Sequence, residues 1–309
     1  MGNTARVIVV AEHEEDLDHL IAVAQSRLAQ LEARWSRFIT SSEVSQLNTA
    51  LRSTWTQVSD DTALLLLYLV EAFHATNGAF NPFLLPALID AGYSHSLSGN
   101  NAVAVSLPSH STWHATASDL ELQQTTSGWQ ARLLNGATVD PGGIGKGLAA
   151  DIVAEQLMSL HACGVSISVG GDLRCMGTPG DAEVWPVDIE DSEDPSHIAA
   201  SVVIPSGGVA TSSTHAKRWH AGSDVRHHVI NPTSGKPIAQ NEPDALHTVS
   251  VVASTAAWAE VFATAVLVSG AKAGTELITS FHLASRATRT DGSSVESASW
   301  AQYASTTLV

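Results

Sequence analysis

The sequence predicts an α+β fold in which mostly antiparallel strands pack with a few long helices. Short runs of alternating polar and apolar residues at 102–107 (AVAVSL) and 129–134 (WQARLL) are typical of antiparallel strands. Residues 14–37 instead carry apolar residues at helical spacing, namely Leu17, Leu20, Ile21, Ala24, Leu28 and Leu31. With 309 residues, 44% of them hydrophobic, the chain is long enough for one large domain or two intimately packed ones.

The first half begins with a strand at 6–10 and the helix at 14–37. Ser41 or Ser42 then caps a short helix, with Ser45 and Asn48 expected beyond it. A second long helix at 60–75 follows the pair Ser59-Asp60 and ends near Asn77-Gly78, which favours a left-handed stop. The next stretch, GAFNPFLLPALIDAGY, contains too many prolines for one helix.

The second half alternates strands with two helices. A helix at 148–161 leads into a buried strand that ends in the turn Gly170-Gly171-Asp172. A last helix at 255–269 precedes residues 274–281 and a terminal hairpin marked by Asp291-Gly292. Further strands are expected at 184–189, 199–204, 227–230 and 247–253.

Composition excludes several classes of partner. The net charge of −16, from 15 basic and 31 acidic residues, predicts that no nucleic acid is bound. The longest apolar run, 63–70, is far shorter than the roughly 20 residues that span a bilayer, so no membrane insertion is expected. The first residues lack a secretory signal, which predicts a cytoplasmic location. Cys163 and Cys175 are too few for a disulfide framework and are expected to be buried.

Residues 139–151, VDPGGIGKGLAAD, carry the strongest functional signal. They place Asp140, a glycine-rich bend and Lys146 at the start of a helix, where free N–H groups and partial positive charge favour a phosphorylated ligand. The segment matches neither GxxxxGK[ST] nor GxGxxG. It could equally be a helix start with structural glycines, or the whole site of an unrelated phosphosugar or nucleotide binder.

Three other segments carry weaker signals. GGDLRCMG at 170–177 could bring bare backbone to a ligand, although a tight turn is the simpler interpretation. In GGVATSSTHAKRWH at 207–220, the hydroxyls of Thr211, Ser212 and Ser213 could bind phosphate oxygens, or the segment could be a polar hairpin. In RHHVINPTSGKP at 226–237, His228 could face a ligand while 231–235 forms a turn, and the spacing does not favour zinc.

The apolar segment 256–268 contains Glu260 and Thr264, which share one face of a helix. A buried glutamate requires a cationic partner, because an unpaired buried charge costs several kcal/mol. Oxygen ligands of this kind suit Mg²⁺, and the alternative is a salt bridge to an arginine or to Lys146.

Taken in order, these segments resemble the ApbE family of FAD:protein FMN transferases. The matching segments are MGNT, WSRFITSSEVSQLN, TNGAFNP, DPGGIGKGLAAD, VGGDLRCMG, GVATSS, HHVINPTSGKP and AEVFATA. The resemblance implies a single ApbE-like domain over residues 1–309 with a mixed, mostly antiparallel sheet. It also implies Mg²⁺-dependent transfer of FMN from FAD to a threonine of an acceptor flavoprotein, with release of AMP. The alternatives are hydrolysis of FAD to FMN and AMP, and a catalytically weak FAD-binding protein.

The resemblance further assigns roles to individual residues. Asp140, Lys146 and Glu260 are the catalytic candidates, with Asp140 or Glu260 as the base. The Gly143 carbonyl, Glu260 and Thr264 are the expected metal ligands. FAD contacts are expected from Phe38, Gly78, Ala79, Phe80, Asn81, Asp140, Lys146, Thr211 and His228.

Several of these positions depart from the family pattern. Glu260 replaces an aspartate and is one methylene longer, so it must shift the ion or its own backbone. Asn81 and Asn231 also replace aspartates, and both keep the capacity to form turns. Pro141 replaces a leucine, and Phe38 stands where some members have a tyrosine, which keeps the ring and loses the hydroxyl.

Overall fold

The fold is described from a computed structural model, which covers residues 4–51, 53–96, 106–222 and 224–305. The contacts divide the chain into two compact units. Unit 1 comprises residues 29–145 and 217–238, and unit 2 comprises the described parts of 3–28, 146–216 and 239–309. The expected strand at 102–107 and most of the MGNT segment lie outside the described residues.

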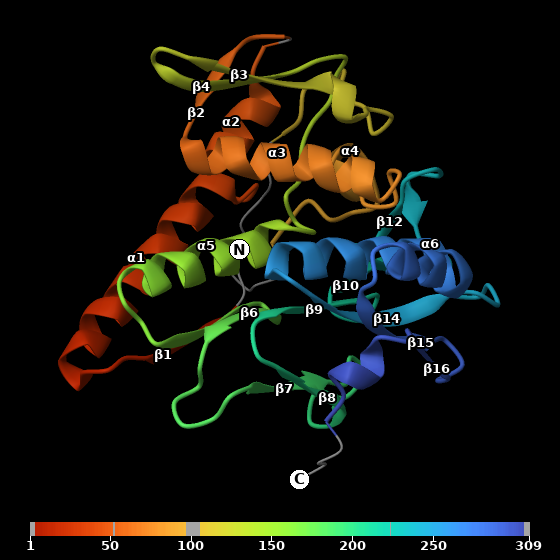
Figure 1. The fold of residues 1–309 in the computed structure, drawn as a ribbon. Coiled ribbons are helices and arrows are strands. Elements are labelled where there is room, and N and C mark those ends of the chain that lie inside the picture. Colours follow the sequence, from red (N-terminus) through yellow and green to blue (C-terminus); the bar gives the residue numbers. More distant parts are fainter. Residues whose placement is uncertain (1–3, 52, 97–105, 223, 306–309) are drawn as a thin grey trace. The chain divides into compact units, whose positions relative to one another are not determined.

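Unit 2 is built on a seven-stranded sheet in which every neighbouring pair is antiparallel (Figure 1). The order is β1-β5-β6-β9-β14-β15-β16. The predicted tight turn joins β5 to β6, because Gly170 and Gly171 take φ angles of 61° and 96° that favour glycine. The strands are β1 (Ala5–Val10), β5 (Gly164–Val169), β6 (Asp172–Gly177), β9 (Gly207–Ser213), β14 (Leu246–Ala253), β15 (Ala284–Arg289) and β16 (Ser294–Glu296).

Different elements cover the two faces of this sheet (Figure 1). Helix α6 (Ala256–Ser280) packs along β9 and β14 on one face. The hairpin of β7 (Trp185–Glu190) and β8 (Ile198–Ile204) packs on the other through an apolar cluster with sheet residues Val209 and Val252. Because side chains alternate along a strand, even-numbered residues of β9 face α6 and odd-numbered ones face the β7–β8 hairpin.

Helix α6 is held at its N-terminus by Asp151 of helix α5 (Gly145–Ser159). The two Asp151 oxygens each accept a hydrogen bond of 2.9 Å, from the N–H groups of Ala256 and Ala257. These amides have no partner inside their own helix, so the carboxylate satisfies them and interacts favourably with the helix dipole. The predicted helix 255–269 matches the first part of α6, which breaks at Gly270 (φ 79°) and continues to Ser280.

By length and composition, α6 is the one helix among the described residues that could cross a membrane. Half of its most apolar window is buried inside the fold, and it carries the buried residue Glu260. The same length and hydropathy are typical of a helix at the centre of a folded core.

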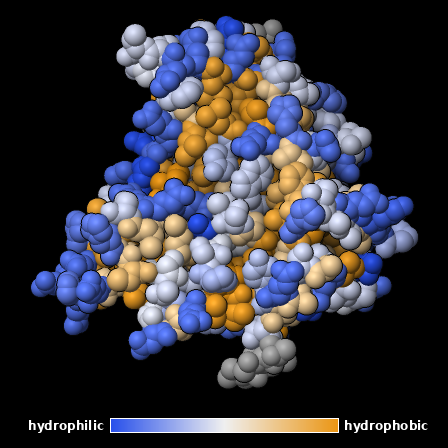
Figure 2. Space-filling model, in the orientation of Figure 1, coloured by the Kyte–Doolittle hydropathy of each residue, from blue (hydrophilic) through white to orange (hydrophobic). Residues whose placement is uncertain are grey.

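Unit 1 combines short helices with small sheets. Helix α1 (Leu17–Trp35) starts in the part of the chain assigned to unit 2 and ends in unit 1, followed by α2 (Glu43–Thr49), α3 (Asp60–Ala75) and α4 (Leu85–Asp90). A three-stranded sheet has the order β2-β4-β3. Apolar residues reach the surface over α3 (Figure 2), where Leu64 and Leu67 are 38% and 46% exposed. The strands of unit 1 are β2 (Thr56–Val58), β3 (Leu120–Thr125), β4 (Gly128–Leu133), β10 (Arg218–Ala221), β11 (Asp224–His227), β12 (Ile230–Asn231) and β13 (Lys236–Pro237).

Some local predictions are wrong. Ser45 and Asn48 lie inside α2, which Ser42 caps by accepting a hydrogen bond from the Ser45 N–H. The long first helix begins with a 3-10 turn at Glu14–Asp16, and Ile21 on its expected apolar face is 37% exposed. Cys163 is exposed because it lies in the turn before β5, whereas Cys175 is buried as expected. The predicted strand 227–230 is interrupted, since β11 ends at His227 and β12 begins at Ile230.

Gly147 allows α5 to approach α6 closely, and Gly147→Ala is expected to lower the free energy of unfolding by about 1–3 kcal/mol. A Cβ atom at this position would lie 2.4 Å from the Ala256 carbonyl oxygen and 2.7 Å from the Ala257 nitrogen. Denaturant unfolding measures the change. Gly145→Ala is the matched control, because its Cβ would meet only Pro141 at 3.4 Å, and it is expected to keep full stability. Equal losses in the two variants would contradict the close approach at Gly147.

Candidate functional site

Three charged side chains meet in unit 2. Lys146 lies in the first turn of α5, Asp172 is the first residue of β6, and Glu260 is on α6. The Lys146 ammonium donates hydrogen bonds to both carboxylates. The second oxygen of Glu260 accepts a hydrogen bond of 2.8 Å from the Gly147 N–H. The salt bridge to Lys146, the alternative expected for Glu260, is therefore present, and Asp172 joins it as a third member.

The cluster is electrostatically unbalanced. The side chains of Asp172 and Glu260 are each 3% exposed and share one ammonium, so the ionised cluster has an excess negative charge. Burial and the nearby Asp172 raise the pKa of Glu260 to about 8, against the opposing effects of Lys146 and the Gly147 N–H. Burial works against the charge of Lys146, but the two carboxylates raise its pKa above the ordinary value, so the ammonium stays charged.

The excess charge fits a divalent cation. The donors are carboxylate oxygens, which Mg²⁺ prefers, and each carboxylate oxygen has lone pairs beyond those used in these contacts. Thr264, the second predicted side-chain ligand, lies one turn beyond Glu260 on α6, and its hydroxyl is 3.0 Å from that of Ser212. The oxygen donors that unit 2 offers thus suit the metal that the sequence predicts.

Thr211 does not belong to this group. It lies on the face of β9 opposite to Ser212, and its hydroxyl pairs with that of Ser250 on β14 at 2.8 Å. Ser212 is therefore the hydroxyl that faces α6, and the sequence alone does not show which residues of a strand lie on which face. Of the segment 207–220, residues 207–213 form a central strand of the sheet, and Arg218–Ala221 begin the two-stranded hairpin of β10 and β11.

Unit 1 holds Asp140 in a well-defined position. One Asp140 oxygen lies 3.4 Å from the Arg37 guanidinium, and the other accepts a hydrogen bond of 2.9 Å from the Gly142 N–H. The Asp140 N–H donates to the Pro82 carbonyl at 2.8 Å. The side chain of Asn48 accepts from the Val139 N–H at 2.7 Å and donates to its carbonyl at 2.8 Å, which fixes the residue before Asp140.

An aromatic cluster adjoins Arg37 in the same unit. The guanidinium lies 4.2 Å from the ring centroid of Phe38 and 4.5 Å from that of Tyr93. Trp219 stacks on Tyr93 with centroids 5.3 Å apart and rings inclined by 15°. The sequence predicts Phe38 as a flavin contact, but it does not predict that Arg37, Tyr93 and Trp219 cluster beside it. Tyr93 and Trp219 lie far from Phe38 and from each other in sequence, and an isolated aromatic residue gives no signal of its neighbours.

The remaining predicted FAD contacts lie in turns of unit 1. Gly78 has a φ of 78°, Phe80 is buried with 3% exposure, and the Asn81 side chain accepts from the Phe83 N–H at 2.8 Å. Asn231 likewise accepts from the N–H groups of Thr233 and Ser234. Both asparagines thus form the turns that the sequence analysis expected of them. Ala79, between Gly78 and Phe80, donates its N–H to the Thr76 carbonyl.

The two adjacent histidines differ in environment. His227 is buried and contacts the Ile238 carbonyl at 3.2 Å, and His228 follows the end of β11. The predicted site is divided between the two units: Lys146, Glu260 and Thr264 belong to unit 2, and Gly143 belongs to unit 1 with Asp140, Phe38 and His228. Contact of FAD with these residues, and of the metal with the Gly143 carbonyl, stays a prediction.

Comparison with solved structures establishes the fold. The ApbE protein from Thermotoga maritima superposes with a TM-score of 0.82 at 20% identity, over 98% of this chain and 96% of that one. The flavinyl transferase ApbE from Pseudomonas stutzeri gives 0.79 at 21% identity, over 98% and 93%. The predicted α+β fold with a mostly antiparallel sheet is confirmed.

Comparison with protein families places the chain more closely. A model of the ApbE family matches residues 1–287, so the chain belongs to the ApbE family, as the sequence predicts. The FAD:protein FMN transferase of Escherichia coli is 31% identical over 141 residues, which are 45% of this chain and 39% of that protein. The FAD:protein FMN transferase of Chlamydia trachomatis is 26% identical over 75% of this chain and 70% of its own length. The match therefore spans about two fifths of the E. coli relative.

The raised pKa of Glu260 predicts a dependence of stability on pH. The Glu260 carboxyl binds its proton more tightly in the native state than in the unfolded chain. The free energy of unfolding therefore falls as pH rises from about 4.5 to about 8 and the carboxyl ionises. The glutamine side chain in Glu260→Gln cannot ionise, so this variant should not show this decrease of the free energy of unfolding with pH. Between pH 5 and pH 8.5, the free energy of unfolding of the wild-type protein should fall relative to that of Glu260→Gln. The expected fall is more than about 1.4 kcal/mol, the equivalent of one pKa unit.

Chemical unfolding in the presence of a chelator measures this difference. Glu276→Gln is the matched control, because it lies on the same helix and is exposed. The same slope in Glu260→Gln and in the unchanged protein would show that Glu260 is ionised throughout the range.

Proposed function

We propose that this protein transfers the FMN moiety of FAD to a threonine hydroxyl of an acceptor flavoprotein, with Mg²⁺ as cofactor and AMP as the released product. Membership of the ApbE family and the names of its relatives support this reaction. The observation that carries it is the buried Lys146–Asp172–Glu260 cluster. In a site with little water, the two carboxylates are suited to bind a metal ion, and the lysine ammonium is suited to bind a pyrophosphate oxygen.

In this proposal, Lys146 binds an oxygen of the FAD pyrophosphate, and Asp172 and Glu260 orient its ammonium group. When bound, Mg²⁺ supplies positive charge to the pyrophosphate and to the leaving phosphate of AMP. The side chains of Glu260 and Thr264, with the Gly143 carbonyl, would hold the ion. The acceptor oxygen forms a bond to the FMN phosphorus while the bond to the AMP oxygen breaks.

The threonine hydroxyl must lose its proton in this step, and Asp140 and Glu260 are the two candidates for the base. Arg37 and the Gly142 N–H hold Asp140 in a fixed orientation. In the metal-free protein burial raises the pKa of Glu260 to about 8, so Glu260 can accept the proton only in molecules in which it is ionised. The Arg37, Phe38, Tyr93 and Trp219 cluster offers flat, apolar surfaces that suit the flavin or adenine ring.

Incubation with FAD, Mg²⁺ and a protein domain that carries an acceptor threonine tests the proposal. Covalent flavin fluorescence on the domain is expected, together with AMP in equal amount. Free FMN and AMP without labelling would instead show hydrolysis, and intact FAD would show binding alone.

Glu260→Ala is expected to reduce the rate at least about 100-fold at a fixed Mg²⁺ concentration, because it removes a metal ligand and leaves Lys146 with one carboxylate. Labelling kinetics measured across a Mg²⁺ titration give the rate and the apparent metal affinity. Glu276→Gln, on the exposed side of the same helix, serves as control and should retain full activity. Full activity and unchanged Mg²⁺ dependence in Glu260→Ala would overturn the metal assignment.

A further inference from the structure

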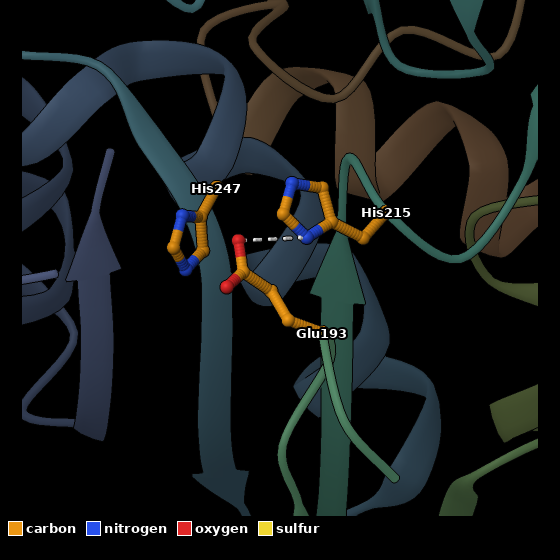
Figure 3. Close-up of side chains that lie close together, drawn as sticks. All are labelled: Glu193, His215 and His247. Carbon is orange, nitrogen blue, oxygen red and sulfur yellow. Dashed lines mark ion pairs between the residues drawn. The ribbon is translucent and has the colours of Figure 1, made fainter. Parts of the chain in front are cut away.

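Glu193, His215 and His247 converge at a second place in unit 2 (Figure 3). Their candidate ligand atoms all lie within 4.8 Å of one another. The Nδ1 atom of His215 is 3.4 Å from a Glu193 oxygen, and the two imidazole rings are stacked with centroids 5.0 Å apart. The residues come from the connection between β7 and β8, the segment after β9, and the beginning of β14. The proposed flavin chemistry uses none of them.

This group lies away from the Lys146–Asp172–Glu260 cluster. On β14, Thr248 faces the β7–β8 side of the sheet, where its hydroxyl is 2.5 Å from that of Ser192 in the same connection as Glu193. Thr248 pairs with Ser213 at one end of β9, and Ala253 pairs with Gly208 at the other end, beside the start of α6. Thr264 of α6 reaches Ser212 at the same end of β9 as Thr248, so the sheet itself separates the two groups, with α6 on one face and the β7–β8 connection on the other.

The backbone holds the three side chains together. The pairing of β14 with β15 shifts between Leu246 and Thr248, so His247 is the additional residue of a β-bulge, a feature that redirects a side chain. The His247 carbonyl accepts a hydrogen bond of 2.9 Å from the N–H of Thr214, the neighbour of His215. Next to Glu193, Asp191 accepts from the Glu193 N–H at 2.8 Å, which shapes the connection.

We infer that Glu193, His215 and His247 form a binding site for a divalent transition-metal ion of the Zn²⁺ class. Two imidazole nitrogens and one carboxylate suit such an ion, whereas Mg²⁺ and Ca²⁺ prefer oxygen ligands alone. The Glu193 side chain is 62% exposed, so it can move to shorten the ligand distances, and water can occupy the open position. The ion would tie the β7–β8 connection to the sheet.

Equilibrium dialysis of the chelator-treated full chain against Zn²⁺ tests this site. Excess Mg²⁺ is included so that Mg²⁺, and not Zn²⁺, occupies the Lys146–Asp172–Glu260 cluster. One Zn²⁺ per chain is expected, and Glu193→Gln and His247→Ala should each weaken binding at least about 10-fold. The double variant His215→Ala/His247→Ala should lose it. His197→Ala is the matched control, because this exposed histidine lies in the same connection and pairs with Asp194, and its variant should bind Zn²⁺ normally.

A second measurement guards against misfolded variants. Zn²⁺ should raise the melting temperature of the wild-type protein and of His197→Ala more than that of Glu193→Gln. Misfolding would not explain this difference, because the Glu193 side chain is exposed. The assignment would be overturned if the wild-type protein bound no Zn²⁺. It would also be overturned if Glu193→Gln bound Zn²⁺ as tightly as the wild-type protein, or if Glu260→Gln lost Zn²⁺ binding.

Discussion

One partly buried ammonium group shared by two buried carboxylates determines the local structure of unit 2. Lys146, Asp172 and Glu260 come from a helix start, a strand start and the middle of a second helix, and none of these charges would be stable there alone. The cluster therefore fixes the relative positions of α5, β6 and α6. It also leaves negative charge in excess, and an excess of carboxylate charge suits a divalent cation.

Small residues make this arrangement possible. Gly147 on α5 and Gly208 on β9 both lie against the backbone at the start of α6, where a Cβ atom would come within 2.4 Å of Ala256 atoms. Asp151 satisfies the first amides of α6 at the same place and lies 3.4 Å from Arg174 of β6. The start of α6 is thus held by contacts with two elements, and Glu260 follows one turn later. The position of Glu260 depends on backbone contacts that no single motif describes.

Local patterns were sufficient to predict most of the longer elements and several of the candidate site residues. The glycine-rich bend identified Lys146, the apolar helix identified Glu260, and the Ser59 cap correctly predicted the start of α3. Asp172 was missed as a partner because its sequence signal is that of a turn residue after two glycines. Tyr93 and Trp219 were missed for a related reason, since their stacking depends on contacts between distant segments. Thr211, Ser212 and Ser213 are named together because the sequence does not show which face of β9 meets α6. The convergence of Glu193 with His215 and His247 likewise depends on strand order and on a bulge.

The glutamate at position 260 can be understood from the same geometry. One of its oxygens bonds to Lys146 and the other to the Gly147 N–H, so the side chain spans the distance from α6 to α5. An aspartate is shorter by about one bond length and could make both contacts only if the helices moved closer. They cannot do so readily, because the backbone of α6 already occupies the space beside Gly147. The longer side chain therefore matches the helix separation of this protein, and it keeps the carboxylate chemistry that a metal or a lysine requires.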